Sequence, residues 1–367
     1  MLLSYKDVTH IHVEVSSLCN ARCPLCPRNL YGVNRDDLGY REHVMTLLEF
    51  KTIFPSEFIW QINEILFNGN FGDSIMNHEL VDIIDYVQSI NPMIRIKITT
   101  NGGARDRKFW QRLAELGVYV IFSIDGLEDT NHLYRQDVNW ATLMDNATTF
   151  IRSGGQAEWK MVRFDHNQHQ IKDMEILASR LGFAEFSVTD HNRNVGPVFD
   201  RRGNFSHSIG NYTGPTEYTV FLDQLLKQKK QSNTVQSTEA QSAHWHARSG
   251  VEPAKNIRCV TQQDKSIYVS SVGEVYPCCF WGFATGDHRG MGASELTMIR
   301  DMIKDHNALE HGLEHAMEWF QRTDSIWNDQ PTIGICHYTC GIDTEQEVVF
   351  YKNDERKPMY AMDKTAD

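Results

Sequence analysis

The stretch Val13–Arg28 reads Val-Glu-Val-Ser-Ser-Leu-Cys-Asn-Ala-Arg-Cys-Pro-Leu-Cys-Pro-Arg. Cys19, Cys23 and Cys26 form a C-x3-C-x2-C pattern at the end of a predicted β-strand. Three thiolates at this spacing can hold one face of a cubane iron–sulfur cluster. Because no fourth cysteine follows nearby, one iron is left open to a small molecule. The pattern therefore predicts a cluster that binds a ligand.

Two other kinds of cysteine site compete with this interpretation. A zinc ion takes four ligands, and His43 or a distant cysteine could complete a set begun by Cys19, Cys23 and Cys26. A disulfide framework is disfavoured, because three such close cysteines cannot all pair and nothing indicates export.

Length and composition narrow the class of protein. The 367 residues are enough for one large domain and a smaller one, and 41% hydrophobic with 23% charged residues is an ordinary globular composition. A net charge of −12 argues against a nucleic-acid partner, which needs a basic face. No apolar run is long enough for a membrane span, and Met1–Asp7 is too short and polar for a signal peptide. We therefore expect a cytoplasmic protein in which the eight cysteines are metal ligands.

Short apolar strands alternate with amphipathic helices, which is typical of a parallel α/β sheet. Strands are predicted at His10–Ser16, Glu64–Phe67, Ile94–Thr99, Val118–Ile124, Ala157–Phe164 and Glu185–Thr189. Helices are predicted at Thr46–Phe54, His78–Gln88, Arg107–Leu116, Trp140–Arg152 and His169–Leu181.

Turn motifs follow the second, third and fourth of these strands. Gly69-Asn70-Phe71-Gly72-Asp73 follows the second strand, and Thr100-Asn101-Gly102 follows the third. Ser123-Ile124-Asp125-Gly126 ends the fourth, with Arg135 downstream. Each is a common turn when taken alone, but chemistry in βα barrels gathers at the carboxyl ends of strands.

The cysteine loop and these three turns, in this order, resemble the radical S-adenosylmethionine (radical SAM) superfamily over roughly residues 8–190. The resemblance implies a partial, six-stranded βα barrel. It also implies a 4Fe–4S cluster whose open iron chelates the amino and carboxylate groups of SAM. An electron from the cluster then cleaves SAM to a 5′-deoxyadenosyl radical. The chain departs from the usual motifs at Leu25, where an aromatic residue is common, and at Ser74, where proline is common.

The same resemblance implies roles for individual residues. Gly69, Gly72 and Asp73 correspond to the turn that receives the SAM amino group, although the family's Gly-Gly-Glu form is here Gly-x-x-Gly-Asp. The resemblance implies contacts with the nucleoside, ribose or carboxylate of SAM for Asn101, Ser123, Asp125 and Arg135. Asp190 and His191, after the sixth strand, are candidate catalytic residues at the barrel mouth.

The second half of the chain contains the other five cysteines. A predicted helix, Thr216–Lys229, precedes Cys259 and a hairpin formed by Ser266–Ser270 and Glu274–Pro277. This pattern resembles the auxiliary-cluster domains called SPASM or, in the shorter form, Twitch. The resemblance implies a second 4Fe–4S cluster on Cys259, Cys278, Cys336 and Cys340. The remaining Cys279 is either a free thiol, a replacement for Cys278, or a hydrogen-atom donor in catalysis. A four-thiolate zinc site is the alternative for the quartet.

The expected organisation is a radical SAM partial barrel over residues 1–195, a linker with a helix over 196–256, a small α+β auxiliary-cluster domain over 257–345, and a tail over 346–367. The expected function is hydrogen abstraction by the SAM-derived radical for oxidative modification of a peptide or protein side chain. A fully ligated second cluster favours net oxidation, because it can take an electron from the substrate radical. Strand one begins near residue 10, so no domain that grips a leader peptide is expected before it.

Two alternative functions stay open at this point. One is dehydrogenation or epimerisation of a small molecule of sugar or nucleoside type. The other is a non-catalytic iron–sulfur or zinc redox protein. The expected partners are SAM, a substrate, and a reductase such as flavodoxin or ferredoxin.

Overall fold

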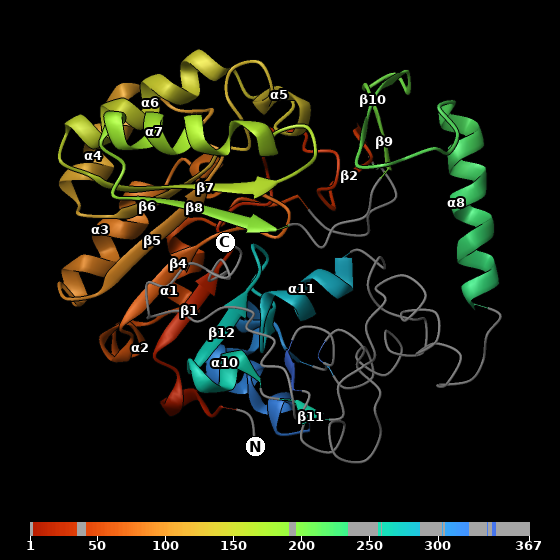
Figure 1. Ribbon diagram of the computed structural model, residues 1–367. Coiled ribbons are helices and arrows are strands. Elements are labelled where there is room, and N and C mark those ends of the chain that lie inside the picture. Colours follow the sequence, from red (N-terminus) through yellow and green to blue (C-terminus); the bar gives the residue numbers. More distant parts are fainter. Residues whose placement is uncertain are drawn as a thin grey trace.

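Strands with one apolar face make the first half of the chain a parallel sheet flanked by helices. The computed structural model describes residues 3–34, 42–190, 196–233, 256–257, 259–286, 303, 305–322, 336 and 340–342. Six parallel strands follow one another across the sheet in chain order (Figure 1). They are β1 (His10–Val13), β4 (Glu64–Phe67), β5 (Arg95–Thr100), β6 (Tyr119–Ser123), β7 (Gln156–Arg163) and β8 (Glu185–Asp190).

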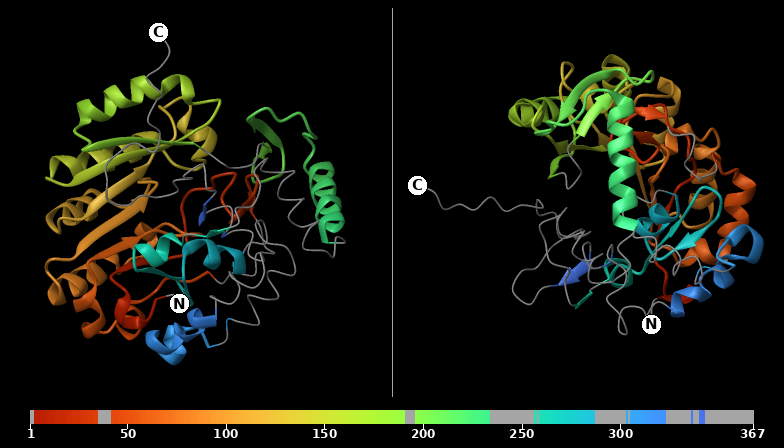
Figure 2. Two further views of the ribbon diagram at one scale, coloured as in Figure 1. Left: turned by 60° about the horizontal axis from the view of Figure 1, so that its bottom comes forward. Right: turned by 90° about the vertical axis from the view of Figure 1, so that its right-hand side faces the viewer.

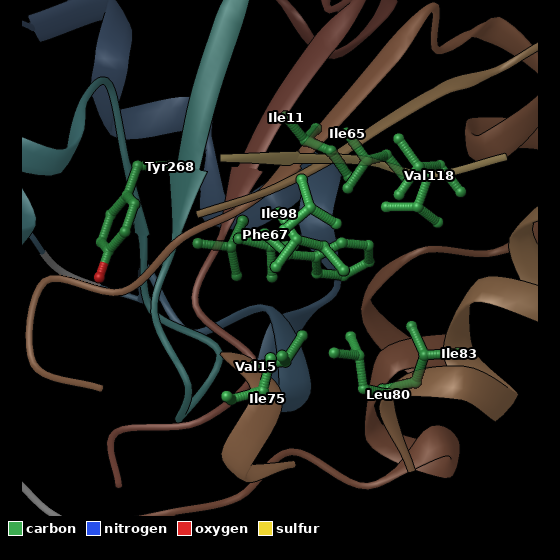
Figure 3. Packing of buried hydrophobic residues seen from close by; sticks show 14 of the residues in the cluster. Ile11, Val15, Ile65, Phe67, Ile75, Leu80, Ile83, Ile98, Val118 and Tyr268 are labelled. Atoms are coloured by element: carbon green, nitrogen blue, oxygen red, sulfur yellow. The ribbon is translucent and has the colours of Figure 1, made fainter. Parts of the chain in front are cut away.

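Strand register divides the sheet into an apolar face and a more polar one. Val13 pairs with Phe67, and Phe67 pairs with Ile98, so these three buried side chains lie on one face. Phe67 and Ile98 lie near the apolar side of helix α3 (Leu80–Ile90), which includes Leu80 and Ile83 (Figure 3). Alternation along each strand turns the neighbouring residues to the opposite face.

Side chains cap the starts of the helices at Leu47–Ile53 (α1), Arg107–Glu115 (α4) and Trp140–Arg152 (α6). Thr46 accepts the Glu49 N–H and so starts α1, while Asp106 and Asn139 accept amide hydrogens at the starts of α4 and α6. Gly182 ends α7 in the left-handed conformation. The helices of this half are α1 (Leu47–Ile53), α2 (Ser56–Gln61), α3 (Leu80–Ile90), α4 (Arg107–Glu115), α5 (Asn131–Tyr134), α6 (Trp140–Arg152) and α7 (Ile171–Leu181). Shorter elements are η1 (Tyr5–Asp7), β2 (Asn29–Leu30), β3 (Val33–Asn34), η2 (Ser74–Met76) and η3 (Gln168–Gln170).

The predicted α/β fold class is confirmed, and each of the six predicted strands is present. The first strand is shorter than predicted, because it ends at Val13 and the chain then turns into the cysteine loop. Beyond the turn, Ser16 makes only an isolated bridge with Val44. Among the described residues, no helix combines the length and apolar character required to cross a bilayer.

The predicted C-terminal hairpin extends the main sheet. Its strands are β12 (Ser266–Val269) and β13 (Val275–Tyr276). Strand β12 pairs in parallel with β1, opposite β4, and β13 pairs antiparallel with β12. The eight-stranded order is therefore β13-β12-β1-β4-β5-β6-β7-β8. The predicted division of the chain at residues 195, 256 and 345 stays a prediction.

A second hairpin and a long helix follow the barrel strands. The elements are β9 (Gly196–Phe199), β10 (Phe205–Ile209) and α8 (Tyr218–Asn233), and α8 lies on the opposite side of the molecule from α3 and α4 (Figures 1 and 2). Phe199 donates its N–H to the Tyr31 carbonyl at 2.8 Å, so this hairpin packs on the chain that follows the third cysteine. The remaining elements are β11 (Asn256–Ile257), α10 (Val260–Gln263), α11 (Cys279–Gly286), α13 (Ala308–His311), α14 (Leu313–Ala316), η4 (Glu318–Arg322) and β14 (Gly341–Ile342).

Candidate active site

The three N-terminal cysteines lie in the loop after β1. The Cys26 N–H donates to the Cys23 carbonyl oxygen at 2.9 Å, and the Asn29 side-chain amide donates to the same oxygen at 3.1 Å. Cys23 is buried, while Cys19 and Cys26 are half-buried. These hydrogen bonds close the C-x2-C segment into a turn that holds the cysteines together.

The environment of Cys19 fits a positively charged inorganic group. Burial raises the pKa of the Cys19 thiol, and the neighbouring Asp73, Cys23 and Cys26 raise it further. Thiols this close deprotonate together only where positive charge compensates them. The irons of a cluster supply that charge, so the donor set is suited to the predicted 4Fe–4S group.

Two side chains from outside the loop reach the cysteine sulfurs. Asn101, directly after β5, places its Nδ2 3.6 Å from the Sγ of Cys19. Arg135, after α5, places its Nη1 3.7 Å from the Sγ of Cys23. Both groups donate hydrogen bonds to sulfur. The structure thus brings two of the predicted SAM-binding residues against the cysteines.

The carboxylate of Asp73 is directed at the turn after β5. Its Oδ2 accepts the Thr100 hydroxyl at 3.0 Å and both the backbone N–H and the side-chain amide of Asn101, at 2.8 and 2.7 Å. Its Oδ1 accepts the Ile75 N–H at 3.2 Å. Burial raises the pKa of Asp73, while these hydrogen bonds lower it. Asp73 therefore braces Asn101, and the predicted contact of Asp73 with SAM stays a prediction.

Gly69 and Gly72 are required because the backbone of the turn approaches β1 closely. A Cβ atom on Gly72 would lie 1.7 Å from the Ser16 carbonyl oxygen. A Cβ on Gly69 would lie 2.7 Å from Oε1 of Glu14. The Asp73 N–H also donates to the Leu18 carbonyl at 2.8 Å, next to Cys19. These contacts fix the turn against the cysteine loop.

Asp125 holds Arg135 in place. The buried Asp125 accepts the Arg135 Nε–H at 2.6 Å on Oδ2 and the Val162 N–H at 2.6 Å on Oδ1. Burial disfavours the guanidinium charge, but Asp125 and then Cys23 raise the net pKa of Arg135. Ser123 ends β6 and pairs in register with Lys160 of β7. Asp125 is thus a positioning residue in this structure, while a contact of Ser123 with SAM stays a prediction.

The two candidate catalytic residues of the sixth strand are only partly described. Asp190 is the last residue of β8 and pairs with Arg163 of β7. His191 lies outside the described residues. Their proposed catalytic roles stay predictions.

The five C-terminal cysteines influence one another electrostatically. Burial raises the pKa of Cys278, and Cys279, Cys336 and Cys259 raise it further. Burial likewise raises the pKa of Cys279 and of Cys340 to about 11. The charge of Cys340 contributes to the raised pKa of Cys279, and the charge of Cys259 contributes to that of Cys340. The predicted quartet and Cys279 therefore lie near enough to influence one another's charge.

One of the C-terminal cysteines accepts a hydrogen bond from an indole. The Trp281 indole N–H lies 3.3 Å from the Sγ of Cys336. Within the described ranges of the chain, no group of three or more His, Cys, Asp or Glu side chains is spaced for a single metal ion. The choice between Cys278 and Cys279 stays a prediction, as does the choice between a cluster and zinc.

Sequence reasoning missed two residues that connect the parts of the site. Glu14 directly follows β1, two residues after His12, and its side chain is 1% exposed. Tyr268 of β12 donates its hydroxyl hydrogen to Oε2 of Glu14 at 2.7 Å. The available signal was a carboxylate between two apolar residues, Val13 and Val15, because buried charges need partners.

Taken together, the fold and the site define a partial βα barrel with a three-cysteine centre at the carboxyl ends of its strands. Residues 13–161 match the model of the radical SAM superfamily. The family expected from the cysteine loop and the strand-end turns is confirmed.

The chain is similar to a known protein in sequence and to solved structures in fold. The chain is 26% identical over 119 residues to the tungsten-containing aldehyde ferredoxin oxidoreductase cofactor-modifying protein of Pyrococcus furiosus, and the match covers 32% of this chain and 31% of that protein. The chain thus spans less than a third of that relative. Among solved structures, Streptococcus suis SuiB bound to its precursor peptide SuiA is 14% identical with a TM-score of 0.50, covering 91% of this chain and 67% of that one.

The structure of anSMEcpe with bound AdoMet is 16% identical with a TM-score of 0.50, covering 91% of this chain and 100% of that one. At this level of identity the two structures establish a common fold.

Proposed function

We propose that this chain is a radical SAM enzyme with its reaction centre at Cys19, Cys23 and Cys26. These cysteines hold a 4Fe–4S cluster, and SAM binds beside it at the ends of β4, β5 and β6. When bound, the cluster and SAM supply a 5′-deoxyadenosyl radical, which abstracts hydrogen from a substrate. The observation that carries the proposal is the convergence of Asn101 and Arg135 on the sulfurs of the cysteine loop.

The protein's own groups hold and shape this centre. Asp73 fixes the orientation of Asn101, and Asp125 fixes that of Arg135. N–H donors and a positive charge at the sulfurs favour the reduced, more negative form of a cluster. The buried residues around the loop keep water away from a reactive intermediate. Asn101 and Arg135 thereby set both the geometry and the redox properties of the centre.

We further propose that the reaction is an oxidative modification of a peptide or protein side chain. The support is the grouping of Cys259, Cys278, Cys336 and Cys340, which are suited to a second 4Fe–4S cluster that accepts an electron. A common fold with SuiB, whose structure contains a precursor peptide, agrees with this substrate class. The expected electron donor is a flavodoxin or ferredoxin in the cytoplasm. A short precursor peptide encoded beside this gene would strengthen the proposal, and sugar-processing enzymes there would weaken it.

Product analysis tests the central reaction. The protein is reconstituted with iron and sulfide without oxygen, reduced with dithionite, and mixed with SAM. We expect 5′-deoxyadenosine and methionine in equal amounts, measured by mass spectrometry. A Cys26→Ala variant is the matched control and should form neither. The proposal fails if the reconstituted protein binds iron but leaves SAM intact.

A further inference from the structure

A buried carboxylate joins the turn after β4 to the C-terminal hairpin. Oε1 of Glu14 accepts the N–H groups of Phe71 and Gly72, at 2.8 and 2.7 Å. Its Oε2 accepts the hydroxyl hydrogen of Tyr268 on β12 at 2.7 Å. Both carboxylate oxygens are thus occupied, one by the turn and the other by a strand from the far end of the chain.

Two further contacts join the same two regions. The Asn70 side-chain amide donates to the carbonyl oxygen of Cys279 at 2.8 Å. Nε2 of His12 lies 2.7 Å from the Asn68 carbonyl, and the His12 ring meets the Tyr268 ring edge-on at 4.9 Å between centroids. Figure 3 shows Tyr268 to one side of the other labelled residues of the hydrophobic cluster. The turn therefore rests on the segment that carries the auxiliary cysteines.

The other end of the turn leads to the cluster loop. Asp73 binds the Asn101 side chain at 2.7 Å, and Asn101 reaches the sulfur of Cys19. Hydrogen bonds at both ends of the turn, joined by the backbone from Asn70 to Asp73, consequently connect Cys279 with Cys19. Spatial continuity alone does not establish energetic coupling, so the link has to be tested by its effect on binding.

The turn has little freedom to absorb a change at Glu14. Gly72 already lies so close to the Ser16 carbonyl that a single added carbon would overlap it. A buried carboxylate that loses one donor carries the cost of an unsatisfied group. The turn would have to move toward Glu14 or away from it, and either movement displaces Asp73 and Asn101.

We propose that Glu14 is a positioning residue that couples the turn Gly69–Asp73 to the auxiliary cysteine segment, so that this segment sets the affinity of the turn for SAM. The inference rests on the proposed function, because it takes SAM as the ligand of the turn. It deepens that function by making the second cysteine site a determinant of cofactor binding as well as a candidate electron acceptor.

The test is the dissociation constant of SAM, measured by calorimetry on the reconstituted protein. Tyr268→Phe removes only the hydroxyl that donates to Glu14. Tyr276→Phe is the matched control, because Tyr276 is equally buried on the neighbouring strand and its hydroxyl donates to Glu274 at 3.1 Å. Iron content and melting temperature are measured for each variant.

We expect Tyr268→Phe to weaken SAM binding on the order of tenfold, the size of one hydrogen bond to a charged group. Its iron content should equal that of the wild type, whereas Tyr276→Phe should bind SAM within about twofold of wild type. Wild-type affinity in Tyr268→Phe, or an equal loss in Tyr276→Phe, would overturn the coupling while leaving the proposed function intact. Failure of the wild-type protein itself to bind SAM would overturn the proposed function and the coupling together.

Discussion

The two groups of cysteines in this protein are assembled in different ways. Cys19, Cys23 and Cys26 come from one loop and are positioned by the strand that precedes it. The C-terminal group is drawn from segments between Cys259 and Cys340 that are far apart in the sequence. A local group can be recognised from its spacing, whereas a dispersed group becomes visible only when the chain has folded.

The groups also differ in what surrounds their sulfurs. Asn101 and the cationic Arg135 approach the N-terminal group, while the indole of Trp281 approaches the C-terminal one. Charge and hydrogen bonds to sulfur are main determinants of a cluster's potential. The first environment is suited to a centre that takes part in chemistry, and the second to a shielded, fully ligated centre.

Removing one cysteine from either group is expected to have the largest effect. The wild-type protein should hold about eight irons in two 4Fe–4S clusters. Cys23→Ala should retain about four irons, in the cluster of the C-terminal group. Cys340→Ala should likewise retain about four irons, in the cluster of the N-terminal group. Iron analysis measures the iron content of each protein, and electron paramagnetic resonance measures the number of clusters. One equivalent of zinc beside four irons would identify the C-terminal group as a structural zinc site.

The turn between the two groups should be the next most sensitive position. Gly72→Ala places a carbon against the Ser16 carbonyl, and we expect a loss of about 3 kcal/mol in the free energy of unfolding. Gly117→Ala is the control, because Gly117 has φ +65° but nothing within 4 Å of an added Cβ. Its loss should be about 1 kcal/mol, from the left-handed backbone alone. Denaturant unfolding compares them, and equal losses would contradict the close approach of the turn to β1.

Lowering the pH should reduce the stability of the folded protein through His12, a buried histidine beside the turn. Burial lowers the pKa of His12 to about 4, although its hydrogen bond to Asn68 raises it. Between pH 6.5 and 4 the unfolded chain binds a proton at His12 that the folded protein does not, so stability falls as the pH falls. The contribution is about 3 kcal/mol across this window.

A His12→Gln variant should therefore show a shallower decline of melting temperature between pH 6.5 and 4 than the wild type. His132→Gln, at an exposed position, is the control and should follow the wild-type curve. Parallel curves for wild type and His12→Gln would mean that His12 is protonated in the folded state.

Much of the fold could be predicted because its signals are local. Alternating apolar residues and the turns that follow them located all six parallel strands, and the spacing of Cys19, Cys23 and Cys26 located the candidate site. Helix α2 was missed because Pro55, which ends the predicted helix, also begins the next one as its N-cap.

The remaining features depend on contacts between distant parts of the chain. The pairing of β12 with β1 has no local signature, and the partner of Glu14 lies 254 residues away. The position of the Asp73 carboxylate likewise depends on Thr100 and Asn101 of the neighbouring strand. Sequence patterns located Asp73 in the right turn but could not reveal which of its neighbours it binds.

The two groups of cysteines are expected to have different tasks, with SAM cleavage confined to the N-terminal group. The measurement is the rate of 5′-deoxyadenosine formation from SAM in reduced Cys23→Ala and Cys340→Ala proteins, each with its iron content determined. Because cleavage requires only the N-terminal group, Cys340→Ala should still form 5′-deoxyadenosine, and Cys23→Ala should form none. Formation of 5′-deoxyadenosine by Cys23→Ala, with none formed by Cys340→Ala, would contradict the account and place the reaction at the C-terminal group.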